Sequence, residues 1–223
     1  MINNLAITEL AFLLVIFLGA WEFWIPKEKE GKNHIDNYLL TSGYFLFFAF
    51  ILILIHIDRL KTVFVEFTLT PFIVLAFSFL LFILIYKSFN SRFKRPERII
   101  TKYPEESFLY MDYRFLVSKS ADIIFQQIAI VTMVIMFQEA GMSLPLMIIS
   151  FGLIFGLIHI PLVRTKGGVF GAYFVLAAAL SAIFFPVLIT QIDYGFVYSY
   201  VVHWLFYILS AVIFWLNQDL LES

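Results

Sequence analysis

The chain has 223 residues, of which 62% are hydrophobic and only 14% are charged, and its mean hydropathy is +0.93. A soluble domain of this length carries roughly a quarter charged residues and under half apolar ones, so this chain has too little polar surface to coat a water-soluble globule. The formal net charge of −1 argues against a nucleic-acid partner, and the absence of cysteine excludes disulfides, thiolate metal sites and a cysteine nucleophile.

Seven apolar segments are long enough to cross a bilayer. A span needs about 20 mainly apolar residues, because the hydrocarbon core is roughly 30 Å thick and a helix rises 1.5 Å per residue. Each span must be helical, since the bilayer core offers backbone groups no water to bond. The sequence therefore predicts an all-α, polytopic transmembrane helical bundle of about seven spans. In chain order, the segments are 5–25, 38–57, 64–86, 119–139, 143–163, 169–190 and 195–216.

The basic residues are divided unequally between the two sides of the membrane. The loops that follow the first, third and fifth segments hold three of them at 27–32, eight at 87–119 and two at 164–166. The opposite loops hold only Arg59 and Lys61. Under the positive-inside rule the rich side is cytoplasmic. We therefore expect a multi-pass protein of the cell membrane with its N-terminus outside and its C-terminus in the cytoplasm.

The segments and loops suggest three regions. Residues 1–118 hold three spans and a basic cytoplasmic loop over 87–118, residues 119–216 hold a four-span core, and residues 217–223 form a short cytoplasmic tail. The loop interleaves basic and aromatic residues, which is typical of a segment that lies on anionic lipid headgroups. A docking site for a partner protein is the alternative reading of this loop.

A few polar residues inside the spans are functional candidates, because such groups are costly in a membrane. Gln126 and Gln127 lie in the fourth segment, His159 in the fifth and His203 in the seventh. Counting from the cytoplasmic ends at 1.5 Å per residue, Gln126 is about 10 Å deep, His159 about 6 Å and His203 about 20 Å. Gln126 and His159 are thus expected at similar depth, and His203 meets them only if a cavity reaches inward or its helix ends earlier. Glu139, at the far end of its helix, is expected to be solvated.

These residues resemble the core of the CAAX-protease and bacteriocin-processing family (CPBP, or Abi) of intramembrane proteases. That family has an EExxxR motif on one helix, an FxxxH motif on the next and a later HxxxN-type motif. Phe155-Gly-Leu-Ile-His159 matches the second motif, and Gln126 and Gln127 stand where the glutamate pair of the first would be. His203 corresponds to the histidine of the third motif.

The resemblance covers roughly residues 119–210 and includes clear departures from the family pattern. Both glutamates are replaced by glutamine, the arginine position is Val131 and the asparagine position is Tyr207. The resemblance implies an intramembrane endopeptidase site in degenerate form, with Phe155 and Tyr207 contacting substrate. Glutamine has the size of glutamate but cannot accept a proton as a general base. Such a site can bind a carbonyl or a water and still hydrolyse slowly or not at all.

Three classes of function follow from this pattern. The leading hypothesis is a catalytically impaired pseudoprotease that binds or escorts a membrane protein or a membrane-anchored peptide. The alternatives are an active CAAX-type intramembrane peptidase with unusual catalytic residues, and a small transporter or channel subunit. No two matching halves of the kind common in transporters are visible. We expect contact with membrane lipids, no cofactor and no metal, since two histidines without carboxylate or thiolate partners make a poor metal site. The histidines and glutamines could also serve simply as hydrogen bonds between helices.

Overall fold

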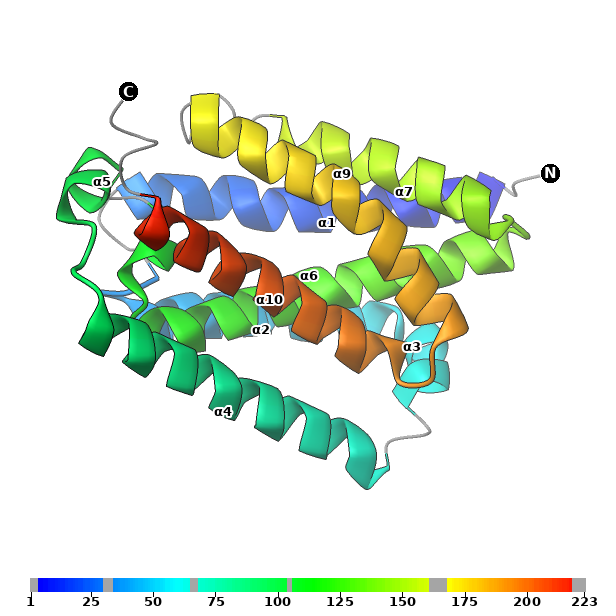
Figure 1. The fold of residues 1–223 in the computed structure, drawn as a ribbon. Coiled ribbons are helices and arrows are strands. Elements are labelled where there is room, and N and C mark those ends of the chain that lie inside the picture. The colour runs from blue at the N-terminus through cyan, green and yellow to red at the C-terminus, as the bar shows by residue number, and fades with distance from the viewer. Residues whose placement is uncertain (1–3, 30–33, 65–67, 104–105, 161–167, 218–223) are drawn as a thin grey trace.

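The computed structural model describes residues 4–29, 34–64, 68–103, 106–160 and 168–217, and these residues are helical or connect helices. This agrees with the predicted all-α class. The helices are α1 (Asn4–Lys29), α2 (Tyr38–Ile55), α3 (Ile57–Phe64), α4 (Leu69–Arg92), α5 (Glu97–Lys102), the 3₁₀ helix η1 (Ser107–Tyr110), α6 (Tyr113–Glu139), α7 (Leu144–His159), α9 (Gly168–Gln191) and α10 (Gly195–Leu216) (Figure 1).

Six of the described helices are long and apolar enough to cross a membrane: α1, α2, α4, α6, α9 and α10. The predicted fifth span, 143–163, is described as the shorter apolar helix α7, with 16 residues. Sixteen residues rise about 24 Å, slightly less than the thickness of the hydrocarbon core. Residues 161–163 of that predicted span lie outside the described part of the chain. The fold is therefore a polytopic helical bundle of the predicted class.

Helix α6 forms the centre of this bundle and is buried along most of its length. It packs against α1, α2, α7, α9 and α10, and it runs through the middle of the view in Figure 1. The helix begins six residues before the predicted start of the fourth span. Asp112 caps it, because the Oδ1 atom of Asp112 accepts a hydrogen bond from the backbone N–H of Arg114 at 2.7 Å. Lys119, which the sequence analysis counted with the basic loop, therefore lies inside the helix.

Helices α7 and α9 form a closely packed antiparallel pair at one side of α6 (Figure 1). A Cβ atom added at Gly152 of α7 would lie 3.0 Å from the Cβ of Ala182 on α9. Small residues of this kind let helix backbones approach in a membrane, where packing replaces the hydrophobic effect as the driving force. The turn from α9 to α10 is tighter still, since a Cβ at Gly195 would meet the carbonyl oxygen of Leu188 at 1.9 Å. Only glycine fits at that position.

The predicted loop 87–118 is partly helical and packs into the bundle. Besides the last turn of α4 it contains α5, η1 and the first turns of α6. Its residues Ile99, Phe108 and Leu109 are buried with side chains of α4 and α10. The indole of Trp215 on α10 donates a hydrogen bond to the carbonyl oxygen of Leu109 at 2.7 Å. This end of the bundle is thus a folded cap rather than an extended surface loop.

At the opposite end of the bundle, Arg59 joins three helices. Its Nη2 atom donates to Glu9 of α1 at 2.6 Å and its Nε atom donates to Glu139 of α6 at 2.7 Å. Glu139 is about half exposed, as expected for a residue at a helix end, but it has an ion-pair partner as well as solvent. The cluster lies at the far end of α6 from Asp112, so it is separate from the polar residues discussed next.

Candidate functional site

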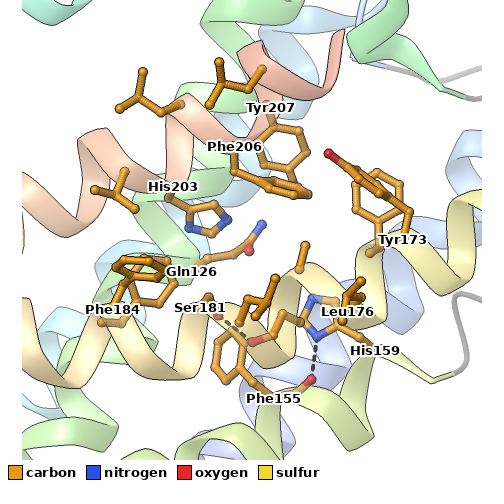
Figure 2. A pocket seen from close by; sticks show the side chains of 18 of the residues that line it. Gln126, Phe155, His159, Tyr173, Leu176, Ser181, Phe184, His203, Phe206 and Tyr207 are labelled. Atoms are coloured by element: carbon orange, nitrogen blue, oxygen red, sulfur yellow. Dashed lines mark hydrogen bonds between the residues drawn. The ribbon is translucent and has the colours of Figure 1, made fainter. Parts of the chain in front are cut away.

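Five of the six predicted site residues line one pocket between α6, α7, α9 and α10. The pocket has a volume of about 490 Å³. Figure 2 shows the His203 ring beside the Gln126 amide, with His159 across the pocket from both. Because His203 reaches the pocket, the cavity extends inward, which is one of the two conditions the depth estimate required. The five residues are Gln126, Phe155, His159, His203 and Tyr207.

Gln127 is the predicted residue that does not line this pocket. Its Nε2 atom donates a hydrogen bond to the hydroxyl of Ser199 on α10 at 2.5 Å, and both residues are fully buried. Adjacent residues on a helix point about 100° apart, so only one of the two glutamines can face the cavity. Gln127 therefore joins two helices, which is the structural alternative considered for such a residue.

The wall of the pocket is mainly apolar and reaches the outer surface of the bundle. Leu176, Leu180 and Phe184 of α9 and Leu209 and Ile213 of α10 line it, and about half of each of these side chains is exposed. An exposed apolar surface on membrane-spanning helices faces lipid rather than water. The pocket thus opens sideways, between α9 and α10, toward the bilayer.

The orientation of Gln126 follows from its partner on the same helix. Its Nε2 atom lies 2.9 Å from the Oδ1 atom of Asp122, and an ionised carboxylate can only accept hydrogen bonds. The amide nitrogen must therefore face Asp122. This leaves the amide oxygen Oε1 of Gln126 as a hydrogen-bond acceptor toward the pocket.

The two histidines present different groups to the pocket. The Nδ1 atom of His159 lies 2.7 Å from the carbonyl oxygen of Phe155, which can only accept, so Nδ1 carries the hydrogen. The Nε2 atom of a neutral His159 ring is then a free acceptor. The His203 ring stacks on Tyr207 at 5.8 Å between centroids, and its buried Nδ1 atom has no hydrogen-bond partner in the described part of the chain. The pocket therefore offers two acceptors, Oε1 of Gln126 and Nε2 of a neutral His159.

A buried ion pair beside the pocket was missed by the sequence analysis. The Nζ atom of Lys119 lies 2.5 Å from the Oδ2 atom of Asp122, and these residues are 6% and 0% exposed. The ammonium group also lies 4.2 Å from the centre of the Tyr207 ring and 5.7 Å from that of Trp21. Lys119, Asp122 and Gln126 have the spacing i, i+3, i+7, which places them on one face of a helix. That spacing is the signal by which the pair could have been found.

The ion pair determines what the neighbouring carboxylate can do chemically. Oδ2 of Asp122 binds Lys119 and Oδ1 accepts from Gln126, so both oxygens are engaged. No aspartate or glutamate is among the described residues that line the pocket. The described residues also contain no group of three or more His, Cys, Asp or Glu side chains that could hold a metal ion. The arrangement can bind an uncharged polar group, but it presents no carboxylate base.

No protein-family model, curated protein or solved structure matches this chain. The fold and the helix lengths define the class: it is a multi-pass helical integral membrane protein whose spans contact lipid. The resemblance to the CPBP family gains no support from these comparisons.

Proposed function

We propose that this protein is a CPBP-like pseudoprotease, which binds the membrane-anchored part of a partner in the pocket between α9 and α10 without hydrolysing it. One observation carries the proposal. Gln126, His159 and His203 come from three helices to one lipid-facing pocket, while the adjacent carboxylate of Asp122 is held by Lys119. The convergence favours a binding site over three unrelated contacts between helices.

The composition of the pocket indicates what it binds. Its volume of about 490 Å³ falls in the range of small-ligand sites, roughly 300–1,000 Å³. The apolar walls suit a hydrocarbon chain, such as the lipid group of a modified peptide. The acceptors of the pocket, Oε1 of Gln126 and Nε2 of His159, suit a hydrogen-bond donor such as a peptide N–H. An apolar chain next to a short peptide fits both the apolar walls and these acceptors.

We expect a photoreactive prenylated peptide to crosslink to α9 and α10 of the protein reconstituted in lipid nanodiscs, and mass spectrometry to show no cleavage. Ala177→Trp places an indole in the pocket and should lower crosslinking by at least about tenfold, since a filled cavity leaves no room for the chain. Leu153→Trp is the matched control, because Leu153 is 61% exposed on α7 and does not line the pocket. Equal crosslinking by both variants would contradict the proposal.

The second candidate is an active intramembrane peptidase, and the observation that favours it is the hydrogen bond from Nδ1 of His159 to Phe155, which leaves Nε2 of a neutral ring as an acceptor. A neutral imidazole can serve as a general base. If the unmodified protein cleaves the prenylated peptide and His159→Ala abolishes the cleavage, the protein is an active peptidase and the pseudoprotease hypothesis is wrong.

The proposed orientation has the N-terminus outside and the C-terminus in the cytoplasm. The unequal division of the basic residues supports it, although Lys32, Arg164 and Lys166 lie outside the described residues. Moving Lys119 from the loop into α6 leaves the imbalance large. Reporter fusions at residues 94, 166 and 223 should report the cytoplasm and a fusion at 141 the outside. A clear outside signal at residue 94 would reverse the orientation.

A further inference from the structure

A second pocket lies at the other side of the bundle, where the end of α4 meets η1 and the start of α6. Its volume is about 560 Å³. It is lined by Lys87 and Ser91 of α4 and by Arg95, Tyr110 and Asp112. In Figure 1 this is the end of α4 from which the chain turns toward α5. None of its residues lines the pocket that contains the histidines.

The lining of this second pocket is positively charged. The carboxylate of Asp112 is engaged by Arg114, whose Nη2 and Nε atoms lie 2.8 Å and 3.1 Å from it. These hydrogen bonds from Arg114 hold the pKa of Asp112 below its usual value. Arg95 lies 4.7 Å above the Tyr110 ring and 3.6 Å from Glu97, an exposed pair of little strength. Lys87 has no ion-pair partner among the described residues.

Tyr86 lies beside the same pocket with its hydroxyl buried in the bundle. The residue is 4% exposed and lines the pocket, and its hydroxyl has no hydrogen-bond partner among the described residues. The neighbouring Asn90, in contrast, donates through Nδ2 to the carbonyl oxygens of Tyr86 at 2.9 Å and of Met111 at 3.0 Å. A buried hydroxyl without a partner is costly. The donors that the pocket offers to a ligand are therefore the two cations Lys87 and Arg95, which suit a group that carries several acceptor oxygens.

The face of α4 beside this pocket is apolar and uncovered. Ile83 lines the pocket and is 40% exposed, and Leu80 and Leu84 next to it are more exposed still. Helix α4 packs against α10 and lies along one edge of the bundle (Figure 1). A molecule with its polar group in the pocket could therefore extend its apolar part along α4 within the bilayer.

We propose that this pocket binds the phosphate-bearing headgroup of an anionic phospholipid, whose acyl chains lie along α4. Lys87 and Arg95 attract the phosphate as charge-assisted donors. The uncovered face of α4 distinguishes a lipid from a free anion, which would gain nothing from that surface. The site does not depend on the function of the histidine pocket.

The test is a competition between fluorescent phosphatidylglycerol and phosphatidylcholine for the purified protein in nanodiscs. Lys87→Gln with Arg95→Gln should lower the preference for phosphatidylglycerol at least about tenfold, since each cation near an anionic surface contributes on the order of a fivefold change. Lys94→Gln with Arg98→Gln is the matched control. It removes the same charge from exposed residues of the same segment that do not line the pocket.

The remaining outcomes distinguish the ligand sources. Millimolar inorganic phosphate should leave lipid binding unchanged; displacement by phosphate would show an anion site and overturn the lipid assignment. An equal loss of preference in the Lys94 and Arg98 control would show diffuse attraction to the membrane surface and overturn the site.

Discussion

Replacing Asp122 by leucine is expected to destabilise the protein by about 3–5 kcal/mol, because it leaves Lys119 as an unpaired charge inside α6. The pair is buried, with Asp122 at 0% exposure, so water cannot replace the lost carboxylate. The loss should appear as a lower Tm of the protein in detergent and a lower yield of folded protein.

A double-mutant cycle separates the effect of losing the ion pair from the effect of changing the size of the side chains. Lys119→Met with Asp122→Leu removes both charges and should recover most of the lost stability, since a buried ion pair can often be replaced by apolar residues at little cost. Asp58→Leu is a control at an exposed pair, where Lys61 lies 2.6 Å from Asp58, and should change the Tm little. If Asp122→Leu alone proved as stable as the unmodified protein, the pair would not be buried as described.

The sequence predicted the helices better than their ends. Apolar length alone locates α1, α2, α4, α6, α9 and α10, because a membrane span is a nearly local property. Hydropathy could not locate the start of α6, since its first turns carry polar and charged residues that read as loop. The start at Tyr113 depends on the Asp112 cap and on burial of Phe115 against the rest of the bundle.

The sequence also predicted only part of the candidate site, because depth in the membrane does not give direction around a helix. Depth along the helices grouped Gln126 with His159, and in the structure both line one pocket together with His203. Depth says nothing about direction around a helix, so it could not separate Gln126 from Gln127. The sequence did not predict a buried Lys119, because a lysine near the expected end of a span normally lies at the membrane interface. Its true place depends on the helix start, which only tertiary packing determines.

Moving the buried carboxylate one turn closer to the pocket is expected to create peptidase activity. The variant is Asp122→Asn with Gln126→Glu, which keeps one negative charge to balance Lys119. A glutamate at position 126 would occupy the pocket lining beside His203 and across from His159, where it could accept a proton from a bound water. General base catalysis typically supplies about 10²–10⁴-fold, so cleavage of the prenylated peptide should rise clearly above that of the unmodified protein.

Gln126→Glu alone should give no peptidase activity, because the carboxylate of Asp122 lies beside it. The Nε2 atom of Gln126 is 2.9 Å from Asp122 Oδ1, so the substitution would bring two carboxyl groups into hydrogen-bond contact beside a single lysine. Two carboxylates at that distance cannot both ionise, and the shared proton would prevent the new glutamate from acting as a base.

The matched control places the same charge on the neighbouring residue. Asp122→Asn with Gln127→Glu has the same net charge, but position 127 contacts Ser199 and does not line the pocket. This control variant should therefore not cleave the peptide. His159→Ala in the cleaving variant should remove the activity, which ties the reaction to the pocket. If the relocated glutamate gives no cleavage in a protein that still folds and crosslinks the peptide, then the missing base is not what prevents hydrolysis. Val131 and Tyr207, the other two positions that depart from the CPBP pattern, would then be the next residues to change.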